Sequence, residues 1–318
     1  MNVDFKKVTV FDGIWEIDRD KANSMPIYQD NDGFFHVNEE FHYAYDQAVV
    51  NYAQANSDMR VDEKVFNYAV FGVDQFGDAE NASADIIMLV SVNKVDNHVT
   101  YLAFETRMLV YIPTVGVGPM HDAYLLGGPQ LLLDTIEQNY GVHINGFIDL
   151  DMSAFVSLID EFGTIVFSGN KAFVDGINED IASFNTSKNL TGEDAVQNAV
   201  LTNGTVELSG MQTLAYLRNA GAEKANIANT VLKQLTEKIV EKGLSGAKTT
   251  LDIALDEMTV SLSRDDVGAL ITIGLSVLES VETIPVGNME GRQDVEKVGV
   301  TCDYAAERAA IIAAIYFE

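Results

Sequence analysis

The sequence contains one cysteine, Cys302, among its 318 residues. A single cysteine excludes an intrachain disulfide and a metal centre built from several cysteines. Long hydrophobic runs are missing too, because no window of about 18 apolar residues is present and the N-terminus lacks the apolar core of a signal peptide. We therefore expect the chain as given to be soluble, and the sequence leaves open whether a membrane anchor precedes Met1 in a longer precursor.

Basic residues are scarce. Lys and Arg total 20 against 48 Asp and Glu, which gives a formal net charge of -28. Such an acidic surface repels phosphate backbones and anionic lipid heads, so nucleic acid is excluded as a partner and a membrane is expected only through an anchor outside this chain. The charge itself favours solubility in a secreted or salt-exposed protein.

Several common enzyme motifs are absent as well. No serine hydrolase elbow occurs, and Gly116-Val117-Gly118 lacks the third glycine and the following helix of a nucleotide-binding loop. Four of the five histidines are His36, His42, His98 and His143, and no two of them have the helical spacing of a metal-ligand pair.

The apolar residues predict alternating strands and helices. Apolar runs indicate strands at 65–71, 86–92, 99–104, 142–150 and 165–167, with the second and third paired as a hairpin in the sheet centre. Helical spacing indicates helices at 37–55, 127–140, 152–162, 210–218, 225–243, 263–279 and 304–316, and the polar stretch 171–207 reads as a surface excursion. We therefore predict an α/β fold with a mixed central sheet covered by helices on both faces.

The hydrophobic content of 47% is enough for one large or two small domains. Short apolar pieces alternate with turn formers from Val8 to Phe35 and predict short strands or an irregular hairpin. We interpret residues 1–65 as an extension of unknown role, packed on or beside a main domain at 66–318.

Five blocks of the main domain, in this order, resemble the LytR-CpsA-Psr family. They are Phe71–Asp74 with Ser83–Asn93, Ala123–Pro129, Ile148–Phe155 with Leu158–Gly163, Leu208–Arg218, and Val298–Tyr316. The resemblance implies an extracytoplasmic cell-envelope enzyme that takes a glycopolymer from a polyprenyl-pyrophosphate carrier, held in an apolar tunnel, and attaches it to peptidoglycan. It also implies a divalent metal ion, Mg2+ or Mn2+.

The resemblance assigns the metal to Asp74, after the first strand, and Asp85, before the second. Mg2+ typically needs only one or two protein carboxylates beside phosphate and water. The alternative is that both are turn or capping aspartates, which are frequent at strand ends.

The arginines that the family uses to grip phosphate are largely replaced here. The positions hold Ser83, Thr106, Ala220 and Ile227, and the loop lysine and asparagine become Pro119 and His121. Arg218 remains in the helix that resembles the active-site helix. Arg107 is one residue out of register, so its recruitment needs a bulge or loop.

The resemblance keeps Arg218 as the catalytic candidate, and Arg107 is a second catalytic candidate if a bulge or loop brings it into the pocket. Arg218, His121 and Tyr124 are the candidates for substrate binding. Arg218 also fits an ordinary helix-surface cation. Two hypotheses follow: a divergent transferase with a rebuilt phosphate grip, or a catalytically degenerate homologue that serves as an extracellular binding or scaffold domain. Whether the chain is an active enzyme is left open at this point.

Overall fold

The computed structural model describes residues 27–29, 35–37, 59–74, 83–95, 98–219, 224–243, 245–246, 248–249, 259–261, 281–285, 292–295 and 299–316. The chain forms two compact units. The first comprises residues 1–149, 260–263 and 276–318, and the second comprises residues 150–259 and 264–275.

A mixed sheet forms the centre of the first unit. Its six described strands lie in the order β12 (Thr259–Val260), β8 (Gly146–Asp151), β3 (Val65–Asp74), β4 (Ser83–Asn93), β5 (His98–Ala103) and β13 (Val281–Pro285). Strand β4 pairs antiparallel with both β3 and β5, whereas β13 runs parallel to β5. The predicted central hairpin and the mixed α/β fold are thereby confirmed.

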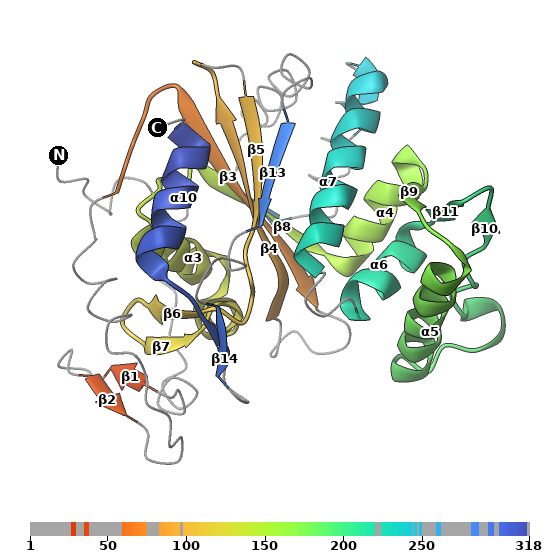
Figure 1. Cartoon of the computed structure of the whole chain (residues 1–318), viewed down its shortest axis with the longest axis horizontal. Helices are drawn as coiled ribbons and strands as arrows, with labels where there is room; N and C mark the ends of the chain where they lie inside the picture. The colour runs from red at the N-terminus through yellow and green to blue at the C-terminus, as the bar shows by residue number, and fades with distance from the viewer. Residues whose placement is uncertain are drawn as a thin grey trace. The chain divides into compact units, whose positions relative to one another are not determined.

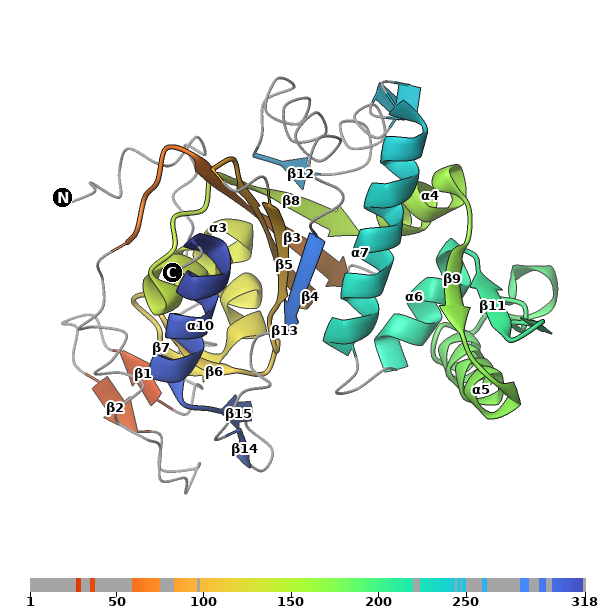
Figure 2. The ribbon, with the colours of Figure 1, turned by 45° about the horizontal axis from the view of Figure 1, so that its top comes forward.

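Helices α3 (Met120–Tyr140) and α10 (Tyr304–Tyr316) lie side by side on one face of this sheet (Figures 1 and 2). The strand residues on that face, such as Phe71, Leu89 and Leu102, are fully buried in the same apolar cluster as the α3 residues. Two polar side chains of the strands reach the last turn of α10: Asn93 Nδ2 donates to the Ile315 carbonyl, and Thr100 Oγ1 donates to that of Ala314.

Helix α3 begins earlier than the sequence predicts. The backbone leaves helical geometry at Gly127 and at Gly128, whose φ is 68°, and resumes with Pro129. The predicted helix from Gly127 to Tyr140 is thus the second part of a kinked element, and residues 120–126 form the first part. The helix ends at Gly141 in the left-handed region, with φ 67°, where glycine is favoured.

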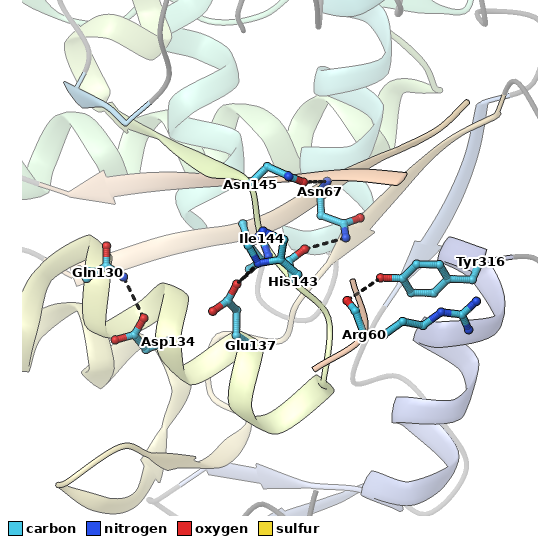
Figure 3. Close-up of polar contacts among 9 residues, drawn as sticks. All are labelled: Arg60, Asn67, Gln130, Asp134, Glu137, His143, Ile144, Asn145 and Tyr316. Atoms are coloured by element: carbon cyan, nitrogen blue, oxygen red, sulfur yellow. Dashed lines mark hydrogen bonds and ion pairs between the residues drawn. The ribbon is translucent and has the colours of Figure 1, made fainter. Parts of the chain in front are cut away.

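A polar network connects α3 to β8 and β3 at the start of β3 (Figure 3). The buried Glu137 carboxylate accepts the backbone N–H of Ile144 at 2.7 Å and lies 3.1 Å from His143 Nδ1. The backbone N–H of Asn67 donates to Asn145 Oδ1, and Asn67 Nδ2 donates to the His143 carbonyl, both at 2.8 Å. These contacts hold the entry of β8 beside β3.

Two smaller sheets belong to the first unit. One has the order β2 (Phe35–Val37), β1 (Ile27–Gln29), β7 (Gly116–Pro119) and β6 (Leu109–Ile112). Most of the segment predicted to form short strands or an irregular hairpin, from Val8 to Phe35, lies outside the described residues. The other is the hairpin of β14 (Gln293–Val295) and β15 (Gly299–Thr301). The predicted helices at 37–55 and 263–279 lie outside the described residues.

The second unit contains α4 (Met152–Phe162), β9 (Ile165–Ser168), α5 (Lys171–Ser187), a 3-10 turn η3 (Gly192–Asp194), β10 (Leu201–Thr202), β11 (Thr205–Leu208), α6 (Gly210–Asn219) and α7 (Lys224–Glu241). The interpretation of 171–207 as an irregular excursion is wrong. Helix α5 buries Val174, Ile177, Ile181 and Phe184 on one face, and the strands β10, β11 and β9 form an antiparallel sheet.

Candidate functional site

The two aspartates implied as metal ligands lie at the same end of the central sheet. Asp74 is the last residue of β3 and pairs with Ser83 at the start of β4. The register shifts here, because Ile86 pairs with Gly72 while Ala84 pairs with Val73. Asp85 is therefore the extra residue of a β-bulge, a device that re-aims a side chain at a sheet end.

The Asp85 side chain is half-buried, while that of Asp74 lies outside the described residues. Within the described part of the chain, no group of three or more His, Cys, Asp and Glu side chains is placed to hold a metal ion. The donor chemistry of two carboxylates on adjacent strands fits Mg2+, which takes its remaining ligands from phosphate and water. The metal assignment stays a prediction.

A third carboxylate joins this end of the sheet from β5. The Phe104 N–H still donates to the Ile87 carbonyl at 2.9 Å, so Glu105 leaves the sheet beside Ile86, one residue from Asp85. We call this end, with Asp74, Asp85 and Glu105, the carboxylate edge.

The loop after β5 also anchors the start of α3. The Thr106 carbonyl accepts the backbone N–H of His121 at 2.9 Å and lies 2.8 Å from His121 Nδ1. Because a carbonyl oxygen only accepts, Nδ1 carries the proton, and Nε2 faces Asp122 Oδ1 at 3.3 Å. Burial raises the pKa of the Asp122 carboxyl, and the neighbouring His121 opposes this rise.

Arg107 lies in a turn, the loop conformation that its recruitment requires, and its side chain is exposed. Its backbone N–H donates to Glu105 Oε1 at 3.2 Å, and its carbonyl accepts the Val300 N–H at 2.9 Å. The other oxygen of Glu105 forms an ion pair with Arg292, with 3.0 Å between Arg292 Nη2 and Glu105 Oε2. No sequence motif marks Arg292, so the sequence did not predict it as a site residue.

Tyr124, in the first part of α3, is buried and donates its hydroxyl to Asp149 Oδ2 at 2.6 Å. Its ring packs edge-on against Phe71, with centroids 6.5 Å apart. Asp149 on β8 is buried as well and was also missed, although a carboxylate inside the apolar run Phe147–Leu150 is a recognisable signal. A role for Tyr124 in substrate binding stays a prediction.

Arg218 belongs to the second unit, in the last turn of α6. Its Nη1 donates to the Met152 sulfur at 3.2 Å, and its guanidinium lies 5.9 Å from the Phe184 ring centroid. Arg218 thus packs against α4 and α5 and is not merely a solvent-facing cation. Ile227 of α7, at an expected arginine position, is buried.

The LytR_cpsA_psr family matches residues 36–309, which is most of the chain. The chain belongs to the LytR-CpsA-Psr family. The match begins inside the segment predicted as an extension, and the division into 1–65 and 66–318 stays a prediction.

Two curated relatives are named polyisoprenyl-teichoic acid–peptidoglycan teichoic acid transferase TagU. The protein from Enterococcus faecalis is 24% identical over 211 residues, covering 63% of each chain. That from Oceanobacillus iheyensis is 22% identical over 233 residues, covering 69% of this chain and 66% of the relative. The chain thus spans slightly less than two thirds of the length of these relatives.

The solved structures agree on the fold. TagT bound to LI-WTA superposes with a TM-score of 0.64 at 18% identity, over 86% of this chain and 99% of that chain. YwtF (TagT) with bound octaprenyl pyrophosphate superposes with a TM-score of 0.60 at 17% identity over the same shares. Within the described residues, no helix has both the length and the apolar character of a membrane span.

Proposed function

We propose that this chain is a divergent cell-envelope phosphotransferase that moves a glycan from a polyprenyl-pyrophosphate carrier to peptidoglycan. The β-bulge at Asp85 is the observation that carries the proposal, since it sets a half-buried carboxylate beside the end of β3, where Asp74 lies. Family membership and the names of the TagU relatives support the same reaction class. The family also supports an extracytoplasmic location at the cell envelope.

In this proposal Asp74 and Asp85 would hold Mg2+ or Mn2+, which would supply positive charge to neutralise the phosphates. The acceptor hydroxyl of peptidoglycan gives up its proton to water and forms a new P–O bond to the phosphorus that carries the glycan. The P–O bond to the carrier breaks, and polyprenyl phosphate leaves with the electron pair. Guanidinium groups that hydrogen-bond the phosphate oxygens stabilise that departing charge, the role we assign to Arg218 and Arg107.

His121 and Tyr124 are the proposed additional substrate-binding residues. His121 sits at the start of α3, where the helix dipole favours an anion. The hydroxyl of Tyr124 donates to Asp149, which fixes the orientation of this side chain for substrate binding.

A specific observation favours the second candidate function, a degenerate binding or scaffold domain. Ser83, Thr106 and the buried Ile227 stand where the resemblance expects arginines. Each charge-assisted hydrogen bond to phosphate contributes about 1.5–3 kcal/mol, so three losses are enough to abolish efficient transfer unless other cations replace them.

The test is titration of the purified chain with octaprenyl pyrophosphate, with and without Mg2+. Wild type is compared with Asp85→Ala, with the near-isosteric Asp85→Asn, and with Glu63→Ala, which removes an exposed carboxylate just before β3, at the opposite end of the strand. We expect Mg2+-dependent binding in wild type and Glu63→Ala, and its loss in both Asp85 variants. Absence of binding in wild type would overturn the transferase proposal and leave the scaffold.

A further inference from the structure

Arg292 lies beside the position where the family resemblance expects an arginine and the sequence has Thr106. Its Nη2 is 3.0 Å from Oε2 of Glu105, the residue immediately before Thr106. The side chains are 25% and 18% exposed, so the pair is largely shielded from water yet reaches the surface. The Arg292 guanidinium, from a distant part of the chain, is thereby held next to position 106, where the expected arginine is missing.

The β14–β15 hairpin fixes this placement. Arg292 immediately precedes β14, and β15 attaches to the loop after β5 through a parallel bridge between Val300 and Met108. The Val300 N–H donates to the Arg107 carbonyl at 2.9 Å. A close approach at Gly299 makes this possible, because a Cβ there would lie 2.5 Å from the Arg107 carbonyl oxygen.

The pair stands at the carboxylate edge. Glu105 leaves the sheet beside Ile86, and neighbouring strands are about 4.8 Å apart, so the backbone of Glu105 lies one residue along the strand from the position opposite Asp85. A group held by Glu105 at this end of the sheet is within side-chain reach of a ligand held by Asp85.

The chemistry of the pair suits phosphate. A guanidinium has five N–H donors in a planar fork, and one carboxylate oxygen takes only one or two, so a single arginine can bind a glutamate and a phosphate together. The pair is neutral as a whole. Its contribution is therefore directed hydrogen bonding from a pre-oriented fork, and lysine is a poor substitute for it.

We propose that Arg292, oriented by Glu105, binds the pyrophosphate of the carrier substrate and takes the place of the arginine that position 106 lacks. This inference rests on the proposed function. It assigns a substrate contact to a residue outside every block that resembles the family, and Glu105 becomes its positioning residue.

The test measures binding of octaprenyl pyrophosphate in Mg2+ to wild type, Arg292→Ala, Arg292→Lys and the double variant Glu105→Gln/Arg292→Ala. Lys64→Ala is the matched control, because it removes an exposed cation from the opposite end of β3. Octaprenol, which has the same tail without phosphates, is titrated in parallel, and the melting temperature of each variant is recorded.

We expect Arg292→Ala to weaken pyrophosphate binding by about ten- to a hundredfold, and Arg292→Lys to recover only part of this loss. Lys64→Ala should bind the pyrophosphate as wild type does. The affinity for octaprenol should be the same in all variants. If Arg292 only neutralised Glu105, the double variant would bind as wild type; we expect it to regain stability but not affinity. Wild-type affinity in Arg292→Ala would overturn this inference alone, whereas no binding by wild type would overturn it together with the proposed function.

Discussion

Replacing Tyr124 with phenylalanine removes one hydroxyl and leaves the ring in its edge-on contact with Phe71. The hydroxyl donates to Asp149 Oδ2 at 2.6 Å, a distance typical of an O–H···O⁻ hydrogen bond, and both residues are less than one-tenth exposed. A hydrogen bond to a charged group contributes about 1.5–3 kcal/mol, so we expect Tyr124→Phe to lower the free energy of unfolding by about 2 kcal/mol.

The assay is urea denaturation followed by circular dichroism, in which the loss appears as a lower midpoint at an unchanged m value. Tyr304→Phe is the matched control. Its hydroxyl donates to a neutral acceptor, the Leu109 carbonyl, so its loss should cost only about 1 kcal/mol. In an Asp149→Asn background the effect of Tyr124→Phe should fall to a similar value, because the acceptor is then neutral.

A loss of less than about 0.5 kcal/mol for Tyr124→Phe, the range of an ordinary surface substitution, would refute this reasoning. An equal loss in the wild-type and Asp149→Asn backgrounds would refute its electrostatic part. In that case the carboxylate of Asp149 would not be the source of the stabilisation.

Three further changes have definite expected outcomes. Gly210→Ala should destabilise the second unit by about 1–3 kcal/mol in urea titrations, since its Cβ would lie 2.5 Å from a backbone carbonyl oxygen of α4; a neutral effect would contradict this packing. Burial, and then the Glu307 carboxylate, raise the pKa of the Cys302 thiol. Native Cys302 should therefore react slowly with iodoacetamide at pH 8, and it should react faster in Glu307→Gln. Equal rates in the two proteins would count against the contribution of Glu307. Burial, opposed by His121, raises the pKa of Asp122, so ionisation of Asp122 opposes folding. Asp122→Asn should therefore raise the melting temperature at pH 7, and this gain should vanish below the usual Asp pKa of 3.8. A gain that does not depend on pH would contradict this reasoning.

The elements with unbroken apolar runs or clear stops were predictable. Strands β4 and β5 follow such runs, α4 ends before Gly163, and α10 has the predicted bounds. Local residue pattern determines these elements because they bury apolar side chains against one common core.

Helix α5 was missed although its signal is present. Val174, Ile177, Ile181 and Phe184 follow helical spacing, and the side chain of Asn170 caps the first turn by accepting the Phe173 N–H. Polar residues that favour loops fill the other positions and outweigh this sparse apolar stripe in a local reading. Packing in the second unit decides the helix.

For the site, residue identity along the chain was enough to indicate the family, the two aspartates at the strand ends and the loss of arginines at the expected positions. Those properties are local, since they depend only on residue identity and order. Only the folded chain reveals that Asp85 sits on a bulge, that Tyr124 is hydrogen-bonded to Asp149, and that Arg292 meets Glu105 from 187 residues away along the chain. Such contacts depend on strand register and hairpin docking, which are set by the packing of the whole unit and leave no local pattern for a sequence reading to detect.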